Sequence, residues 1–316
     1  MRSTQRPLGS GLGAQSTPRE VLAARRLDGI TAIVTGGYAG VGLETTRALT
    51  GAGATVIVPA RTPGKAREAL APLAHVEVED LDLADPRSID AFAARFLESR
   101  RPLHLLINNA GIMAPPLSRD ARGFESQLAT NHLGHFQLTM RLWPALKKAH
   151  GARVVALSSR GHRRGGIDFD DPQFERRPYD KWVAYGQSKT ANALFALALD
   201  ARGEPHRVRA FSVHPGAALT DLMRSLSPEE QKAAIAAARS SGFKTVEQCA
   251  ATSVWCATSP QLEGQGGVYC EDCDIAAAVP ADFSGAGGVR PWAMDPALAE
   301  RLWTKSEEWT GAAFPG

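Results

Sequence analysis

The feature that most constrains the fold is a regular alternation of short apolar, β-branched segments with longer segments of helical pattern, starting at residue 30. We predict strands at residues 30–35, 55–59, 75–79, 103–108, 153–158, 208–213 and 267–270. We predict helices at residues 41–50, 63–73, 86–100, 121–149, 179–201 and 246–258. Strands that are apolar almost throughout and alternate with helices are typical of a parallel sheet covered on both faces. The sequence therefore predicts a doubly wound α/β fold with a mostly parallel, seven-stranded sheet flanked by helices.

No repeat or linker divides the 316 residues, of which 44% are hydrophobic, enough for a sizeable core. We predict one domain over residues 28–316, preceded by an N-terminal tail and short helix in residues 1–27. Thr17, followed by Pro18, is placed to begin that helix. Three glycines between residues 9 and 13 favour a flexible tail before it.

The charge pattern argues against several partners. The 36 basic and 33 acidic residues are interspersed and give a net charge of +3, so we expect neither nucleic acid nor an anionic membrane as partner. The most apolar stretch, residues 191–199, is too short to span a bilayer, and no secretion signal is recognisable, so we expect a cytoplasmic protein. Cys270 and Cys273 have CxxC spacing but lack a second ligand pair, so we expect no metal.

A glycine-rich turn joins the first predicted strand to the first helix. Residues 35–42 read TGGYAGVG, with the spacing Gly-x-x-x-Gly-x-Gly counted from Gly36. Glycines at such a turn let the backbone approach a pyrophosphate, and the following helix N-terminus supplies amide donors. We therefore predict a dinucleotide site in which the turn contributes Thr35, Gly36, Tyr38, Gly40, Val41 and Gly42.

Tyr185 and Lys189 stand four residues apart near the start of the long helix at residues 179–201, so they share one helical face. A free tyrosine has a pKa of about 10, too high to exchange protons readily near neutral pH. A neighbouring ammonium would stabilise the phenolate and lower the pKa of Tyr185. This spacing also occurs by chance, and the alternative is that Tyr185 is a half-buried core residue.

With these motifs in order, the sequence resembles the short-chain dehydrogenase/reductase family over nearly all of residues 28–274. Residues 131–136 (NHLGHF) and 182–192 (WVAYGQSKTAN) are similar to the retinol dehydrogenases and to the oxidoreductase domain of the WW-domain-containing oxidoreductase. The resemblance implies a Rossmann fold. It also implies hydride transfer between a nicotinamide cofactor and a small carbonyl or alcohol substrate. Because no membrane anchor or WW module is recognisable, we do not expect retinol as substrate.

The resemblance also implies roles for individual residues. Tyr185 exchanges the proton, Ser159 positions the substrate oxygen, and Lys189 binds the ribose and lowers the pKa of Tyr185. Asn131 links Lys189 to solvent; the alternative is that this asparagine caps or kinks its helix. The further residues that the resemblance places at the cofactor are Asp82, Leu83, Asn109, Ala110, Gly111, Pro215, Gly216 and Thr220.

The end of the second strand favours NADP(H) over NAD(H). A NAD enzyme needs a carboxylate there for the ribose hydroxyls, but the position holds Ala60, followed by Arg61. A small residue beside a guanidinium suits a 2′-phosphate, which arginine can bind in bidentate fashion. The alternative is that Arg61 is simply a solvated residue at a strand end.

Two other functions remain open: a non-catalytic NADPH-binding sensor or scaffold, and a reductase of carbon–carbon double bonds, as light-dependent protochlorophyllide reductases are. The family resemblance implies a dimer or tetramer formed through the helices before and after the fifth strand. The apolar face of residues 191–199 agrees with that, although a face buried within the chain would look the same. The loops at residues 160–178 and 221–245 carry no pattern that identifies a substrate.

Overall fold

The computed structural model describes residues 4–240 and 243–316 and is built around one sheet. Its strands are β1 (Thr31–Val34), β2 (Thr55–Ala60), β3 (Val76–Asp80), β4 (Leu105–Asn108), β5 (Ala152–Leu157), β6 (Val208–His214), β7 (Val268–Glu271) and β8 (Asp274–Ile275). They lie in the order β3-β2-β1-β4-β5-β6-β7-β8, and all neighbours are parallel except β7 and β8. The doubly wound, mostly parallel sheet is confirmed, but the predicted count of seven strands is wrong.

The additional strand, β8, is only two residues long and follows a two-residue hairpin turn. Asp272 and Cys273 form that turn with φ values of 51° and 58°, and Glu271 pairs with Asp274 across it. Such turns normally carry Asn-Gly or Asp-Gly. Because Asp-Cys is not a typical hairpin sequence, the pattern gave no signal for this strand.

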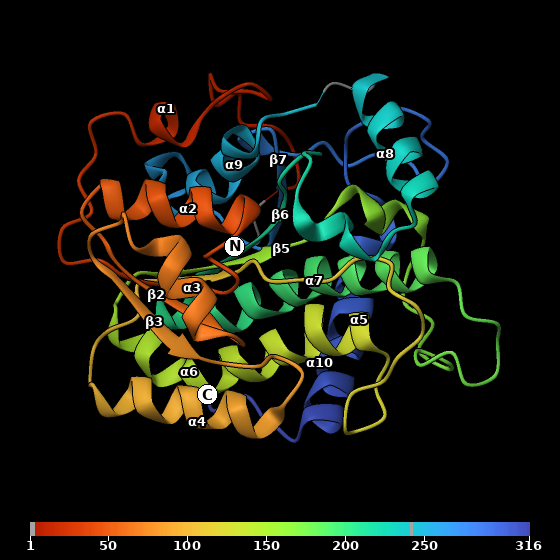
Figure 1. Cartoon of the computed structure of the whole chain (residues 1–316), viewed down its shortest axis with the longest axis horizontal. Coiled ribbons are helices and arrows are strands. Elements are labelled where there is room, and N and C mark those ends of the chain that lie inside the picture. The colour runs from red at the N-terminus through yellow and green to blue at the C-terminus, as the bar shows by residue number, and fades with distance from the viewer. Residues whose placement is uncertain (1–3, 241–242) are drawn as a thin grey trace.

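Helices cover both faces of the sheet (Figure 1). On one face lie α2 (Gly40–Gly51), α3 (Pro63–Leu70) and α9 (Val246–Thr258), and on the other α4 (Pro86–Glu98), α6 (Gly134–Lys148), α7 (Lys181–Gly203) and α10 (Pro296–Thr310). Side chains alternate along each strand, so Ile33 packs in the core of the second face while Ala32 and Val34 pack in that of the first. Each face therefore has its own apolar core.

The predicted helix at residues 121–149 starts later and is not continuous. It consists of α5 (Ser126–Leu128), a π turn at Ala129–Leu133 and α6. Glu125 caps it, because its carboxylate accepts the backbone N–H groups of Gln127 and Leu128. In the π turn the N–H of Gly134 reaches back to the carbonyl of Ala129, which widens the helix at this point.

Two helices were not predicted, α8 (Pro228–Ser240) and α10. The helix α10 packs on the apolar face of residues 191–199. Trp303 of α10 stacks on Phe195 of α7 with ring centroids 6.1 Å apart, and the Arg202 guanidinium pairs with the Glu300 carboxylate. The apolar face of α7 is thus covered within the chain. The dimer or tetramer stays a prediction, now without this support.

The N-terminal segment is also more ordered than its glycines indicated. Gln5 donates from its side chain to the carbonyl oxygens of Tyr269 and Ala276, and its own side-chain oxygen accepts the N–H of Tyr269. The Asp274 carboxylate accepts three successive backbone N–H groups, from Leu8 to residue 10. This segment therefore lies along β7 and β8. Downstream, Thr17 caps α1 (Pro18–Leu22) as predicted.

Within residues 4–240 and 243–316, no helix combines the length and the apolar character needed to cross a membrane. The four cysteines at positions 249, 256, 270 and 273 are buried and unpaired. In the same part of the chain, no three or more His, Cys, Asp or Glu side chains are grouped so that they could hold a metal ion.

Candidate active site

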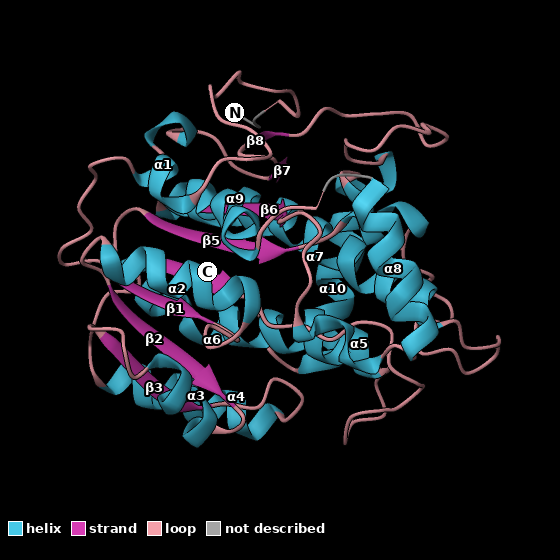
Figure 2. Ribbon diagram, turned by 45° about the horizontal axis from the view of Figure 1, so that its top comes forward, coloured by secondary structure: helices cyan, strands magenta, loops and turns pink. Residues whose placement is uncertain are grey.

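One cavity lies at the carboxyl ends of the strands, where β1 and β4 are neighbours although β2 and β3 intervene in sequence. Figure 2 shows β2 and β3 on one side of β1 and β5 on the other. Ligands of open α/β sheets bind at such a topological switch point. The cavity is lined by every residue predicted for the cofactor, namely Thr35, Gly36, Tyr38, Gly40, Val41, Gly42, Arg61, Asp82, Leu83, Asn109, Ala110, Gly111, Tyr185, Lys189, Pro215, Gly216 and Thr220. Ser159 lines it as well, whereas Asn131 lies immediately behind it.

The turn between β1 and α2 requires glycine for two different reasons. Gly36 has a φ of 64°, which a residue with a side chain adopts only with strain. A Cβ atom on Gly42 would lie 2.4 Å from the carbonyl oxygen of Gly36 and 2.5 Å from Nδ2 of Asn109. The first turn of α2 can therefore pack this closely only with glycine at position 42. The N-cap of α2 is Ala39, which has no capping side chain, so the helix N-terminus can offer its amides to a phosphate.

At the end of β2 the position of the expected carboxylate holds Ala60, which is buried, and Arg61 beside it is exposed. Asp82, after β3, uses its carboxylate locally, because Oδ1 accepts the N–H of Ala84 at 2.9 Å. Leu83 is buried, and its carbonyl oxygen is so near Gly134 that a Cβ there would lie 2.3 Å from it. The edge of the cavity next to β2 therefore carries one guanidinium.

Ser159 and Tyr185 lie within hydrogen-bonding distance of each other in the cavity. Ser159 is the second residue after β5, and Tyr185 lies in the second turn of α7 with 6% of its surface exposed. The ring of Tyr185 packs against Gly161, where a Cβ atom would lie 2.8 Å from ring carbon Cε1. The loop after Ser159 can therefore approach the phenol closely because position 161 is glycine.

Lys189 is held one helical turn further along α7. Its ammonium donates to the carbonyl oxygen of Leu157 at 2.9 Å and lies 5.6 Å from the ring centroid of Tyr185. Burial lowers the pKa of Lys189 to about 8. The predicted Tyr-Lys pair is therefore brought together on one face of the helix.

Two influences act on the pKa of Tyr185 in this structure. Burial has the largest influence and raises the pKa of the phenol, while a hydrogen bond with Ser159 acts in the opposite direction. The pKa of Tyr185 is therefore raised in this structure, and the lowering that was expected from the Lys189 ammonium together with an oxidised nicotinamide stays a prediction.

Asn131 lies in the π turn and is completely buried. Its Oδ1 atom accepts the N–H of Ile112 at 2.9 Å, and its Nδ2 atom donates to the carbonyl of Ile112 and to Oγ of Ser188. Ser188 in turn donates to the carbonyl of Tyr185 at 2.8 Å. The asparagine therefore connects the segment after β4 with the helix that carries the Tyr-Lys pair.

After β6, the Pro215–Gly216 turn and Thr220 close the cavity opposite the glycine turn. Gly216 has a φ of 110°, and a Cβ there would lie 2.5 Å from the side chain of Lys244. Thr220 caps a 3₁₀ helix at Asp221–Ser225. His214 is buried and does not line the cavity, and burial keeps its pKa well below the ordinary histidine value.

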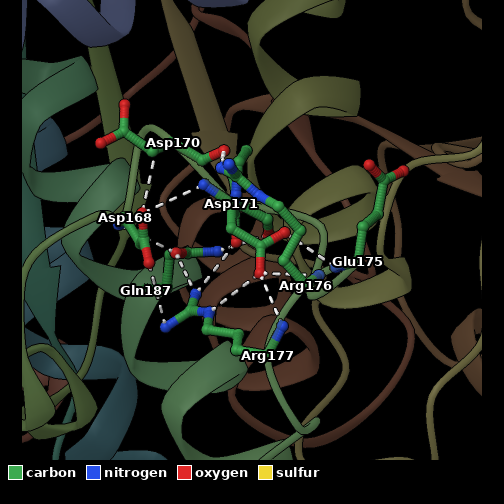
Figure 3. Close-up of polar contacts among 8 residues, drawn as sticks. Asp168, Asp170, Asp171, Glu175, Arg176, Arg177 and Gln187 are labelled. Atoms are coloured by element: carbon green, nitrogen blue, oxygen red, sulfur yellow. Dashed lines mark hydrogen bonds and ion pairs between the residues drawn. The ribbon is translucent and has the colours of Figure 1, made fainter.

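The loop between Ser159 and Tyr185 is held by its own carboxylates and by α7 (Figure 3). The Asp171 carboxylate accepts the backbone N–H groups of residues 175–177. Gln187, which stands between Tyr185 and Lys189 in sequence, accepts the N–H of Asp168 and donates to the carbonyl of Pro172. Arg177 pairs with the carboxylates of Asp168 and Asp171. These contacts fix a segment for which the sequence offered no pattern.

Several lining residues were not predicted. Leu222 and Arg224 come from the 3₁₀ helix after Thr220, and Ile112 and Thr130 come from the segments next to Asn131. Ser158 also lines the cavity, and its hydroxyl donates to the carbonyl of Lys189 at 2.7 Å. Arg224, which adds a second guanidinium to the cavity, lies in a loop without a recognisable motif, so only the fold identifies it.

Comparison with known proteins agrees with this geometry. The family model for short chain dehydrogenases matches residues 30–231. A Streptomyces antibioticus protein named as an oxidoreductase is 44% identical over 291 residues, which cover 88% of this chain and 96% of that protein. Human retinol dehydrogenase 12 is 39% identical over 292 residues, covering 90% of this chain and 88% of the relative.

Solved structures of other proteins also share this fold. A crystal structure of an uncharacterised protein from Mycobacterium paratuberculosis has a TM-score of 0.74 and 33% identity, and covers 94% of this chain and 98% of that one. The NADP complex of Pseudomonas aeruginosa RhlG shares the fold, with a TM-score of 0.64, 23% identity, and coverage of 78% of this chain and 95% of that chain. From the matched family model and these relatives, the chain belongs to the short-chain dehydrogenase/reductase family of oxidoreductases.

Proposed function

We propose that the protein is an NADP(H)-dependent oxidoreductase that interconverts a carbonyl compound and a primary or secondary alcohol, with Tyr185 as acid and base. The observation that carries this proposal is the convergence of Ser159, Tyr185 and Lys189 with the residues of the glycine turn in one cavity. The name of the retinol dehydrogenase relatives, which denotes an alcohol substrate, also favours this pair of substrates.

When bound, the nicotinamide cofactor supplies or accepts the hydride. The hydroxyl of Ser159 holds the substrate oxygen, and the phenol of Tyr185 gives that oxygen its proton during reduction. Lys189 lies close enough to Tyr185 to bind the ribose and to stabilise negative charge on the phenol. Asn131, through Ser188 and the segment at Ile112, fixes the position of the helix that carries both residues.

The pH dependence of the two directions follows from the protonation state of Tyr185. An ordinary tyrosine pKa near 10 and its further rise on burial both leave the phenol protonated at neutral pH, so reduction can begin without prior titration. Oxidation needs the phenolate, so its rate should rise with pH. The reduction rate should instead stay level through neutral pH and fall only when the phenol titrates.

The preference for NADP(H) can be tested at Arg61. We expect Arg61→Ala to raise the KM for NADPH about 10- to 100-fold, the equivalent of losing one charge-assisted phosphate contact, and to change the KM for NADH less than about threefold. Arg67→Ala, an exposed arginine in α3 outside the cavity, is the matched control. Equal losses for the two cofactors in initial-rate kinetics would contradict a phosphate-binding role for Arg61.

The catalytic proposal is tested by following NADPH and NADH oxidation with a panel of aldehydes and ketones, and by identifying the products. Turnover to alcohols supports the proposal. Products reduced at a carbon–carbon double bond would favour the alternative reductase. Tight NADPH binding without turnover on any member would favour a sensor or scaffold.

We also propose that residues 28–316 form one domain. The support is that the core beneath α4 and α6 draws on both ends of the chain, including Ile33 near the start and Trp303 near the end.

A further inference from the structure

His135 is a buried histidine that the proposed mechanism does not use. It lies in the first turn of α6, four residues after Asn131, and only 2% of its surface is exposed. Both of its ring nitrogens make hydrogen bonds. Nε2 lies 2.9 Å from Oγ1 of Thr35, and Nδ1 lies 3.0 Å from the backbone carbonyl oxygen of Asn131.

The hydrogen bonds of Thr35 determine where His135 carries its proton. The Thr35 hydroxyl oxygen accepts the backbone N–H groups of Asn109 and Ala110, each at 2.9 Å, so both of its lone pairs are engaged. Its hydroxyl hydrogen can then only be donated, and the nearest acceptor is Nε2 of His135, since the carbonyl of Ile107 is 3.4 Å away. Nε2 must therefore be unprotonated.

The other ring nitrogen, Nδ1, carries the proton. A carbonyl oxygen can only accept, so the contact with Asn131 requires a hydrogen on Nδ1. A doubly protonated ring would leave the Nε2 hydrogen facing the fully engaged oxygen of Thr35. Burial, with the Lys189 ammonium nearby, lowers the pKa of His135 to about 4, so the ring is neutral near pH 7.

These contacts of His135 join the glycine turn to the π turn, two parts of the site that are far apart in sequence. Thr35 begins the glycine turn and ties it to the segment after β4, since Nδ2 of Asn109 also donates to the carbonyl of Thr35 at 2.8 Å. Asn131 connects that segment to the helix of Tyr185 and Lys189. His135 is the side chain that links Thr35 directly to the π turn in which Asn131 lies.

We propose that His135 is a positioning residue, fixed in the neutral tautomer with its proton on Nδ1, which holds Asn131 in register with the glycine turn. The effect of His135 on the reaction rests on the proposed function. The tautomer of His135 is independent of that function, because it follows from hydrogen bonds within the chain.

The tautomer is tested first, without any activity measurement. Imidazole nitrogens of the ¹⁵N-histidine-labelled full chain are recorded by NMR at pH 7, and the His135 signals are assigned as those missing from His135→Asn. We expect the shift of a protonated nitrogen at Nδ1 and of an unprotonated nitrogen at Nε2. The opposite tautomer, or a charged ring, overturns the proposal whatever the enzyme does.

Two substitutions separate the two contacts. His135→Asn places an amide near the position of Nδ1 and can still donate to Asn131, but it cannot reach Thr35. His135→Gln places its amide near the position of Nε2 and keeps the contact with Thr35 only. We expect each to lower kcat about tenfold, since small misplacements in a site are costly, while the KM for the carbonyl substrate stays within about twofold.

The control is His132→Gln, at the neighbouring buried histidine, which pairs with Oγ of Ser306 at 2.8 Å and does not contact Thr35. It should lower thermal stability yet leave kcat per NADPH-binding site unchanged. Because His135 acts through Asn131, the double variant His135→Asn/Asn131→Ala should be no slower than Asn131→Ala alone.

Losses that multiply in the double variant, or a kcat unchanged in folded His135 variants, would overturn the positioning role. If the unmodified protein turns over no substrate, the proposed function fails, and the NMR measurement together with the effect of His135→Asn on NADPH affinity decides the inference. An Nδ1 proton and at least a threefold weaker affinity would support it, and an unchanged affinity would overturn it.

Discussion

Tyr185→Phe is expected to lower kcat for carbonyl reduction about a thousandfold, in the middle of the range that removal of a general acid usually costs. The phenol of Tyr185 hydrogen-bonds with Ser159 in the cavity, so its loss removes the proton donor that we propose for the substrate oxygen. The phenyl ring can still pack against Gly161, so the fold and NADPH binding should be retained.

Tyr179→Phe is the matched control for this variant. Its phenol lies outside the cavity and contacts the carbonyl of Pro115 and the carboxylate of Glu125, so its loss should change kcat less than about threefold. Stopped-flow or steady-state NADPH oxidation gives kcat, and fluorescence titration gives the affinity for NADPH. If Tyr185→Phe keeps more than a tenth of the turnover, another group supplies the proton and the assignment is wrong.

The sequence predicted the sheet well because each strand is marked by a local property. Residues such as Ile33 and Ile57 lie in apolar, β-branched runs that a parallel sheet buries on both faces, and glycine or helical pattern follows each run. The antiparallel β8 was missed, since two residues make too short a run and Asp272–Cys273 is an unusual hairpin turn.

The candidate site was predictable to the extent that its residues occur in motifs. Gly42 and Lys189 stand at fixed spacings within short segments, and the fold brings those segments to one cavity. Arg224 was missed because its loop has no such pattern. The burial that raises the pKa of Tyr185 was not predicted, since the depth at which the phenol lies depends on packing that motif spacing does not report.

The termini were the least predictable parts, because their contacts also depend on packing that no local pattern reports. Gln5 is an ordinary polar residue in sequence, and its three hydrogen bonds to β7 and its neighbour appear only in the folded chain. The helix that contains Trp303 covers residues 191–199, whose apolar face is equally suited to a partner subunit or to this helix. A sequence pattern indicates that a helix face is buried, but it does not identify the segment or subunit that covers it.

Acidification below about pH 6 is expected to destabilise the fold steeply, because four histidines are buried in neutral form. Burial lowers the pKa of His132 to about 3 and the pKa of both His135 and His162 to about 4, and it holds the pKa of His214 well below its ordinary value. In the unfolded chain all four return to an ordinary histidine pKa of about 6.5.

The lowered pKa values mean that stability falls as the pH falls. Below pH 6.5 the four histidines bind protons in the unfolded chain but stay neutral in the folded protein. Their contribution to the free energy of unfolding is therefore fully present above pH 6.5 and is lost as the pH falls towards 4. Each histidine contributes about 1.4 kcal/mol for each pH unit, so four remove about 5 kcal/mol by pH 5.5. Glu125 and Glu271 oppose part of this, because burial raises the pKa of both carboxyls and favours their protonated forms in the fold.

The free energy of unfolding in urea at pH 7.5, 6.5 and 5.5 measures this loss, which is comparable with the whole stability of a typical domain, about 5–15 kcal/mol. His132→Gln removes one of the four protons, so the fall between pH 7.5 and 5.5 should shrink by about 1.4 kcal/mol even if the variant is less stable throughout. His150→Asn removes an exposed histidine and is the control for that comparison. An unfolding free energy that does not change over this range would mean that the buried rings accept protons as readily as those of the unfolded chain, and it would contradict the lowered pKa values of these histidines.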